Sequence, residues 1–282
     1  MVKMIRTELW KMIHQKSFYV ALGIGVFLSL WDSLDTFRIV HEMIPGILRN
    51  SSRKMYEGIG LFGLWMSVTG GMNMGSYIFK MIWPVLAAIP FGWSYWSERK
   101  EGSFCQIVVR SKKITYFFAK YLTVFISGGI VIAIPLLLNL LTDALFCPVY
   151  PPSPANSYYA ISSGVFLSKL FYLHPWFYSF IWIVVSFLLG GVTACLCFVL
   201  GNYPPFGVIV TLFPFALFML IGTLTSTFLI SDNNAKLLLH PLLMVYACPG
   251  ALNPAWLIFS YIIIFGMFSW IVGFFQVVRK EL

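Results

Sequence analysis

Long runs of apolar residues, separated by short polar segments, dominate the pattern along this chain. The runs cover residues 18–31, 76–96, 116–141, 177–200, 205–230 and 256–275. All but the first hold about 20 residues or more, the length that an α-helix needs to cross a hydrocarbon core of roughly 30 Å. Backbone groups in lipid must be hydrogen-bonded within their own segment, so runs of this length predict helices. We therefore expect an all-α, polytopic integral membrane protein with six transmembrane helices.

Prolines and two shorter apolar stretches modify this picture. Pro84, Pro90, Pro135 and Pro214 fall inside the predicted spans, where we expect them to kink the helices rather than end them. The stretches 59–74 and 237–247 are apolar but too short to cross a membrane, so they are predicted to be interfacial or re-entrant segments.

The composition agrees with a membrane protein. Hydrophobic residues make up 59% of the chain and charged residues 10%, against about 25% charged in average soluble domains. We expect one transmembrane domain over residues 1–282. Its parts outside the spans are an amphipathic helix (1–16), an outer loop (32–75), a charged segment (97–115), a second outer loop (142–176) and an outer re-entrant segment (231–255).

The basic residues predict the orientation. If both termini are cytoplasmic, most of the 19 Lys and Arg residues fall on the inner side, close to the ends of the spans. Cytoplasmic segments of membrane proteins carry such an excess. The chain is therefore predicted to be a multi-pass protein of a cell membrane, and we expect a bacterial plasma membrane with both termini inside.

The N-terminal residues predict an amphipathic helix. Val2, Ile5, Leu9, Met12 and Ile13 share one face of a helical wheel. The other side carries the basic residues Lys3, Arg6, Lys11 and His14. Such a helix is suited to lie along the inner leaflet. The alternative is a positively charged anchor for the first span.

Catalytic and metal-binding patterns are missing from the sequence. The four histidines are scattered, and no glycine-rich nucleotide loop ending in Gly-Lys-Ser/Thr occurs. The five cysteines lack the spacing of a metal site, although Cys147 and Cys248 both fall on the predicted outer side, which leaves a disulfide between them open. We therefore expect no enzyme activity and no bound cofactor in this chain.

Ionisable residues within the predicted spans are few. Lys80 and Asp143 both lie near span ends, where snorkelling toward the interface would explain them. A proton- or sodium-coupled transporter usually carries such groups deep in its helices. The pattern therefore argues against an ion-coupled secondary transporter or channel, which stays the alternative function.

The charged segment between the second and third runs is the most informative part of the chain. Its first residues, 98–101, alternate in charge, and Gly102 and Ser103 follow them. Phe104, Ile107 and Val108 then recur at helical spacing before a basic cluster at 110–113. A short amphipathic helix of this kind can rest in a groove on a partner. The alternative is a basic loop that only sets topology.

This segment resembles the permease subunits of type-2 ABC transporters, the membrane halves of ATP-driven exporters. That family shows an acidic residue followed by Gly and Thr or Ser, then an apolar helix, a Pro-x-Ser-Arg-like turn and a Lys at the start of the third span. Here these positions are matched by residues 101–103, by Arg110-Ser111-Lys112-Lys113 and by Lys120. The proline is missing, since Val109-Arg110 stands there, and Lys113 replaces the usual arginine. The opening helix and the six spans are also similar.

The resemblance implies partners and site residues. ATP and Mg²⁺ would be bound by two separate cytoplasmic ABC ATPase subunits, and a second permease chain, identical or related, would complete the translocation path in the lipid bilayer. No nucleic acid partner is expected. The cargo would be a peptide, such as an antimicrobial peptide, a lipid or an amphipathic drug-like compound. The long outer loops would gate the exit, receive cargo or act as a passive cap.

Two groups of residues follow from this resemblance. The predicted ATPase interface, in which Glu98 and Glu101 pair with basic residues of the partner and Phe104 and Ile107 fill its groove, comprises Glu98, Arg99, Glu101, Gly102, Ser103, Phe104, Ile107, Arg110 and Lys113. The predicted path lining comprises Asn73, Ser76, Tyr77, Thr211, Thr223, Thr225 and Ser226. Small and hydroxyl side chains are also ordinary helix-packing residues.

Overall fold

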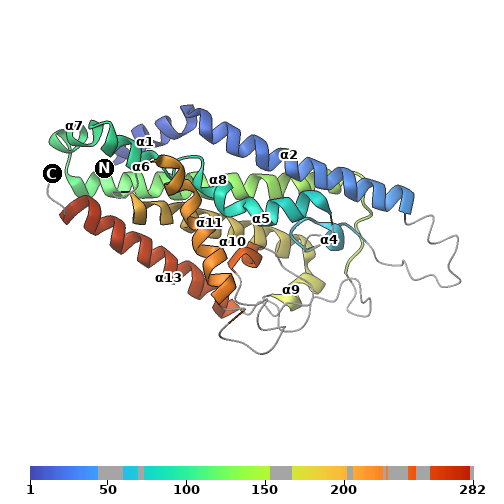
Figure 1. Ribbon diagram of the computed structural model, residues 1–282. Coiled ribbons are helices and arrows are strands. Elements are labelled where there is room, and N and C mark those ends of the chain that lie inside the picture. The colour runs from blue at the N-terminus through green and yellow to red at the C-terminus, as the bar shows by residue number, and fades with distance from the viewer. Residues whose placement is uncertain are drawn as a thin grey trace, which may run out of the picture.

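In a computed structural model, residues 1–43, 60–68, 73–152, 167–201, 206–224, 227, 241–245 and 255–279 are described. Within these residues the chain is helical, without strands. The helices form an elongated bundle, and both termini lie near the same end of it (Figure 1). Five helices are long and apolar enough to cross a membrane, so the chain is a multi-pass membrane protein by length and composition.

The long helices correspond closely to five of the predicted runs. They are α2 (Lys16–Arg38), α8 (Lys113–Asp143), α10 (Pro175–Cys195), α11 (Gly207–Leu224) and α13 (Ala255–Phe274). Three of them continue in tighter or wider turns, namely Ile39–Met43 and Phe275–Arg279 as π-helix and Leu196–Leu200 as 3-10 helix. The N-terminal helix, α1 (Val2–His14), is confirmed as a helix.

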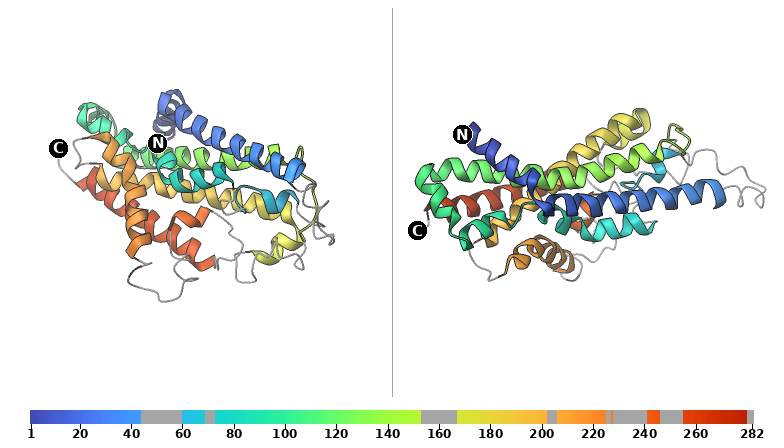
Figure 2. Two further views of the ribbon diagram at one scale, coloured as in Figure 1. Left: turned by 45° about the vertical axis from the view of Figure 1, so that its right-hand side comes forward. Right: turned by 90° about the horizontal axis from the view of Figure 1, so that it is seen from above.

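Helix α8 is the centre of the bundle and packs against α1, α2 and α10. Its closest approach is to α10, where Gly128 faces the backbone oxygen of Gly190 and the side chain of Ala194. A Cβ atom on Gly128 would lie 2.5 Å from the Cβ of Ala194. Small residues allow helix backbones to approach closely in membrane proteins. Helix α2 runs alongside α8 on another side (Figure 2).

The second predicted span is broken. Helix α5 (Met74–Ala88) ends two residues before Pro90, a turn follows, and α6 (Ser94–Lys100) continues in a new direction. Pro90 therefore ends a helix, contrary to the prediction, whereas Pro84, Pro135 and Pro214 lie inside helices. Ile89 still has a helical conformation and donates to the Val85 oxygen, but Pro90 has no N–H to continue the ladder, so the helix stops there. With 15 residues, α5 is too short to count among the candidate spans.

Two short segments are inserted into the bundle. They are residues 61–68, which begin with α4 (Leu61–Leu64), and the 3-10 helix Pro241–Val245. The Trp83 indole donates to the backbone oxygen of Leu242 (3.1 Å), and the Trp182 indole donates to that of Val245 (2.9 Å). These tryptophans come from α5 and α10. Both segments are largely buried against other helices, and their interfacial or re-entrant position stays a prediction.

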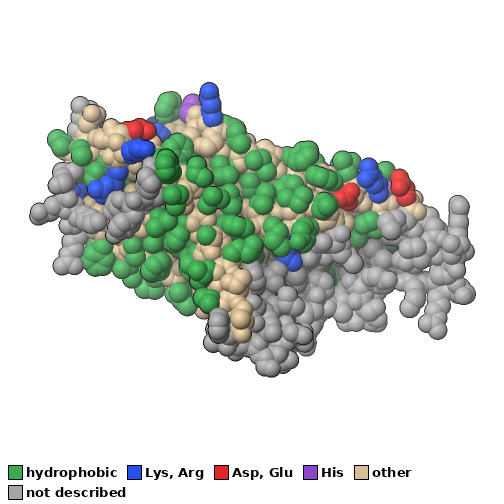
Figure 3. Space-filling view, in the orientation of Figure 1, with side chains coloured by type: hydrophobic (Ala, Val, Ile, Leu, Met, Phe, Trp, Pro, Cys, Tyr) green, Lys and Arg blue, Asp and Glu red, His purple; other side chains and the backbone are tan. Residues whose placement is uncertain are grey.

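The first outer loop is shorter than predicted, because α2 includes residues 32–38. Most of this loop, and much of the second one, lie outside the described residues. The second loop ends in a short helix, α9 (Ser168–Leu173). On the surface, hydrophobic side chains cover the flank of the bundle, while charged side chains gather toward its two ends (Figure 3). This distribution suits a helix bundle that crosses a lipid bilayer.

Candidate functional site: the charged cluster of α1, α6 and α8

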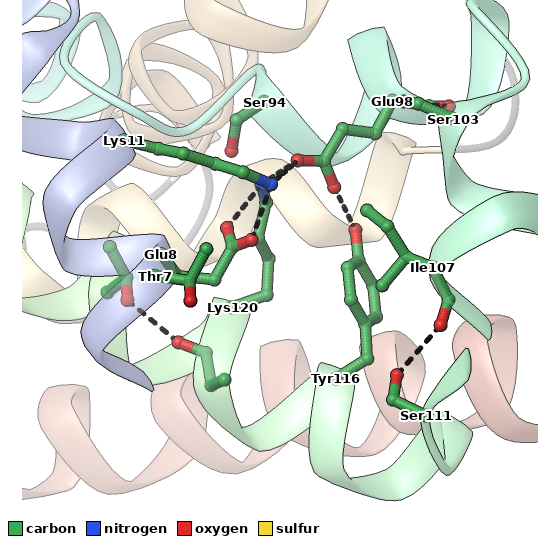
Figure 4. Close-up of polar contacts among 12 residues, drawn as sticks. Thr7, Glu8, Lys11, Ser94, Glu98, Ser103, Ile107, Ser111, Tyr116 and Lys120 are labelled. Atoms are coloured by element: carbon green, nitrogen blue, oxygen red, sulfur yellow. Dashed lines mark hydrogen bonds and ion pairs between the residues drawn. The ribbon is translucent and has the colours of Figure 1, made fainter. Parts of the chain in front are cut away.

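Three helices that are distant in sequence bring four charged side chains together near the termini. Figure 4 shows the group, which we call the inner cluster: Glu8 and Lys11 from α1, Glu98 from α6 and Lys120 from α8. Lys120 Nζ lies 2.9 Å from Glu8 Oε2 and 2.8 Å from Glu98 Oε1. Lys11 Nζ lies 2.7 Å from Glu8 Oε1 and 3.1 Å from Glu98 Oε1. Each ammonium thus bridges both carboxylates.

The inner cluster is charge-balanced and largely buried. The side chains of Glu8 and Lys120 are fully buried, and the Lys120 ammonium also lies 4.4 Å from the centre of the Phe91 ring. Removing one partner of such a buried pair leaves an uncompensated charge, which costs about 3–5 kcal/mol. The cluster therefore fixes α1 and α6 on α8.

Electrostatics inside the inner cluster favour its ionised form. Burial alone would raise the pKa of Glu98, but the Lys120 ammonium, the Tyr116 hydroxyl and Lys11 outweigh it and lower that pKa. Burial alone would lower the pKa of Lys11, but Glu8 and Glu98 outweigh it and raise that pKa. Both directions indicate stable ion pairs near neutral pH.

A cleft opens onto the inner cluster and leaves part of it exposed. It has a volume of about 350 Å³ and lies between α1 and the α5–α6 turn. Its lining residues are Trp10, Lys11, His14, Gln15, Phe91, Trp93, Ser94, Ser97 and Glu98. The cleft explains why Lys11 and Glu98 keep partial exposure while Glu8 and Lys120 have none.

The corner between α6 and α7 (Ser103–Arg110) is built on one glycine. Gly102 has a φ of +74°, a left-handed conformation that side chains with a Cβ rarely adopt. The Ser103 hydroxyl then donates to the backbone oxygen of Glu98 (3.2 Å), and at the far end of α7 the Ser111 hydroxyl donates to that of Ile107 (2.9 Å).

The residues predicted for the ATPase interface divide into two groups. Glu98 is engaged within this chain, since it pairs with Lys11 and Lys120 and accepts a hydrogen bond from the Tyr116 hydroxyl. Phe104 is only 5% exposed and packs edge-on against Tyr116, with ring centroids 5.3 Å apart. In this structure the chain's own helices occupy both side chains, and their contact with a partner stays a prediction.

The other predicted interface residues are more accessible or form local contacts. Glu101 is exposed and accepts a hydrogen bond from Ser97 (2.6 Å). Arg99 donates to the Tyr95 hydroxyl (3.1 Å). Ile107 and Lys113 are half-buried, and Arg110 ends α7 with its side chain outside the described part. The outward face of α7 is instead formed by Cys105, Gln106 and Val109, and Val109 is 83% exposed.

Helix α1 packs on the bundle through only part of its predicted apolar face. Met12 is buried, and Ile5 and Leu9 are half-buried, but Val2 and Ile13 are exposed. The helix is turned so that Glu8 faces α8, because the Lys120 ammonium lies there. A single acidic residue one turn before Met12 on the helix could have indicated this, but nothing in the sequence names its partner.

The predicted path-lining residues come from α5 and α11, and the contacts of those that the structure describes are mostly local. Asn73 and Ser76 are buried, and the Ser76 hydroxyl donates to the Asn73 backbone. Tyr77 is 50% exposed. The hydroxyls of Thr211 and Thr223 donate to carbonyls of their own helix, α11. Thr225 and Ser226 lie outside the described residues. The structure thus brings Asn73 and Ser76 together and gives the two threonines local roles.

A second polar cluster was missed at sequence level. Asp32, assigned to a loop, is fully buried in α2, and Asp143 is fully buried at the end of α8, which excludes snorkelling for it. Asn139 joins the two helices, since its Nδ2 donates to Asp32 Oδ2 (3.2 Å) and to the Ser33 hydroxyl (3.0 Å). We call Ser29, Asp32, Ser33, Asn139, Thr142 and Asp143 the outer cluster. It lies at the end of the bundle away from the termini.

No metal site or cysteine bridge emerges from the part of the chain that the structure describes. There, no three His, Cys, Asp or Glu residues are grouped to hold a metal ion. Cys147 is a buried free thiol, and burial raises its pKa to about 12. Cys248 lies outside the described residues.

Comparisons with known proteins leave the family of this chain undetermined. No protein-family model matches the sequence, and no curated protein matches it either.

Proposed function

We propose that this chain is the membrane-spanning permease subunit of an ATP-driven exporter of the type-2 ABC class. Two cytoplasmic ATPase subunits would bind ATP and Mg²⁺, and a second permease chain would complete the path through the membrane. Both termini and α7 would then face the cytoplasm. The cargo expected from the resemblance is an amphipathic peptide, a lipid or a drug-like compound.

One observation carries this proposal, namely the way α7 is connected to the bundle. Helix α7 lies between α6 and α8 and exposes Cys105, Gln106 and Val109. Its neighbour Glu98 is tied to Lys120 of α8 and, through Lys11, to α1. A force applied to α7 would therefore reach the central helix and the N-terminal helix through buried ion pairs rather than through a loose loop. This is the arrangement that a coupling element requires.

The exposed face of α7 offers a sharp test. A charge in the centre of an apolar contact disrupts binding, so Val109→Asp should remove the association with an ATPase subunit. Leu173→Asp is the matched control, because Leu173 is 73% exposed on α9, at the other end of the bundle. The measurement is purification of the tagged chain from its native membrane in mild detergent, with identification of the co-purifying proteins and assay of ATP hydrolysis.

The expected result is a co-purifying protein with a nucleotide-binding glycine loop and ATP hydrolysis. Both should be present with the unmodified chain and with Leu173→Asp, and lost with Val109→Asp. Absence of any nucleotide-binding protein with the unmodified chain would contradict the proposal. Equal retention by the two variants would contradict the role of α7.

An ion-coupled transporter or channel is the second candidate. Asp32 and Asp143 favour it, because they place two buried carboxylates in helices that were expected to lack them. Ionisable groups inside a membrane bundle commonly mark ion pathways. Transport by the purified chain in liposomes under an ion gradient, without any ATPase, would favour this candidate over the exporter.

A further inference from the structure

The outer cluster contains two carboxylates with different surroundings. Asp32 is well supplied with donors, since its Oδ1 accepts the backbone N–H of Ser76 (3.1 Å) and its Oδ2 accepts the side-chain amide of Asn139 (3.2 Å). Neither side-chain oxygen of Asp143 accepts a well-formed hydrogen bond among the described residues, although Asp143 is 0% exposed; the Ser33 hydroxyl is the one donor close enough to act on it electrostatically, and it also pairs with Thr142. Burial without a well-formed hydrogen bond strongly disfavours an ionised carboxylate.

A second unpartnered oxygen lies on the opposing helix. The Ser29 hydroxyl of α2 is buried and without a hydrogen-bond partner among the described residues. It lies one helical turn before Asp32, and its backbone oxygen accepts the same Asn139 amide (3.2 Å). The Ser33 and Thr142 hydroxyls meet at 2.7 Å between the two helices. Oxygen atoms thus dominate this part of the α2–α8 contact.

The charges around Asp143 do not neutralise it. Asp32 lies within electrostatic reach and adds a second negative charge. One turn further along α2, the Asp35 carboxylate is 3.8 Å from the Arg38 guanidinium, whose side chain is 69% exposed. Among the described residues, His41 and Glu42 lie in the π-helix after α2, and the Cys147 thiol, on which Asp143 acts electrostatically, follows α8. In the described structure no cationic side chain pairs with Asp32 or Asp143.

We propose that Asp143, supported by Asp32, is a binding site for one monovalent cation, either a proton or an alkali metal ion. One positive charge would compensate the unpartnered carboxylate and reduce the repulsion between the two acids. Carboxylate and hydroxyl oxygens are the hard donors that such cations prefer. The site is distinct from the inner cluster and does not depend on the proposed exporter function.

The test uses the purified full chain in lipid nanodiscs at neutral pH. Infrared spectroscopy would detect the carbonyl stretch of a protonated carboxylic acid. Thermal unfolding would be followed while choline chloride is replaced by sodium or potassium chloride at constant ionic strength. Asp143→Asn removes the site with little change in shape. Asp35→Asn is the matched control, because it removes a carboxylate of α2 that has a cationic partner.

A carbonyl band that is present in the unmodified chain and in Asp35→Asn, but lost in Asp143→Asn, would identify a proton. A saturable rise of the unfolding temperature with sodium or potassium, without the band and lost in Asp143→Asn, would identify an alkali metal ion. If the unmodified chain shows neither signal, or if Asp143→Asn retains the signal, the proposal is overturned. Should Asp143→Asn not fold, Asp32→Asn is the second variant, and an unchanged signal there would contradict the supporting role of Asp32.

Discussion

The inner and outer clusters bury polar groups in the same helix, α8, with opposite electrostatic outcomes. In the inner cluster two carboxylates meet two ammonium groups, and every charge has a partner at 2.7–3.1 Å. In the outer cluster two carboxylates meet amide and hydroxyl groups, and Asp143 accepts no well-formed hydrogen bond among the described residues. Burial of a charge is tolerated when its partner is buried with it. The comparison separates a cluster that holds helices together from one that can respond to ions.

Removing the Lys120 ammonium should leave the inner cluster with two carboxylates and only one cation. This change should give the largest loss of stability. Lys120→Met leaves Glu8 fully buried with only Lys11 near it, and Glu98 loses its closest cation. We expect a loss of about 3–5 kcal/mol in the free energy of unfolding. Lys112→Met, at an exposed position, is the control. Unfolding in detergent would measure both.

The same measurement on Asp143→Asn sharpens the comparison. We expect it to change the stability by less than about 1.5 kcal/mol, because an amide replaces a carboxylate that accepts no well-formed hydrogen bond. A loss in Lys120→Met no larger than in Lys112→Met or Asp143→Asn would show that charge balance does not distinguish the clusters.

The contribution of Glu98 to the free energy of unfolding should be lost at acidic pH. Its folded-state pKa is lowered, so its contribution is present above the unfolded value of about 4.3 and is lost as the pH falls through the folded value. Glu98→Gln should cost about 2 kcal/mol at neutral pH. This difference should disappear in strong acid, as unfolding curves at a series of pH values would show. Glu101→Gln, on the exposed side of the same corner, should follow the unmodified chain, and a constant difference for Glu98→Gln at every pH would contradict the ion-pair role.

The contribution of Lys11 to the free energy of unfolding should be lost at alkaline pH. Its folded-state pKa is raised, so its contribution is present below the unfolded value of about 10.4 and is lost as the pH rises through the folded value. The inner cluster is therefore expected to be intact between about pH 5 and pH 10.

The smallest loss of stability should come from substitution of Gly102, in the turn before α7. Gly102→Ala forces a Cβ into a left-handed conformation and should cost about 1 kcal/mol, although no atom lies within 4 Å of the added carbon. Gly102→Asn should recover part of this loss, because asparagine tolerates this conformation better. Thermal unfolding would rank the three proteins. Equal stability of all three would show that the ion pairs alone position α7.

The positions of the long helices could be predicted from the sequence, but the contacts between residues of different helices could not. Apolar runs located α8, α10 and α13 within a few residues, because hydrocarbon thickness dictates length, and they located the starts of α2 and α11, whereas α2 continues seven residues beyond its run. Asp32 was placed in a loop because charge normally ends a span, but the Asn139 amide on another helix stabilises it in α2. Pro90 was expected to kink a helix, although its rigid ring ended α5 instead.

The contacts that were not predicted join residues that are far apart along the chain. Glu98 and Lys120 are 22 residues apart, and Glu8 and Lys120 are 112 apart. No local pattern encodes such distances. Phe104 has helical spacing with Ile107, which identified an apolar face correctly but not the surface it covers, because Tyr95 and Tyr116 of this chain lie there.

The tryptophan contacts of the Pro241–Val245 segment have a consequence for how the chain is assembled in the membrane. The carbonyls of Leu242 and Val245 receive hydrogen bonds from Trp83 of α5 and Trp182 of α10, helices that are synthesised earlier. Backbone carbonyls outside a regular helix are costly in bare lipid. Both carbonyls are satisfied only when α5 and α10 are packed together, so we expect the segment to be seated after these two helices have met.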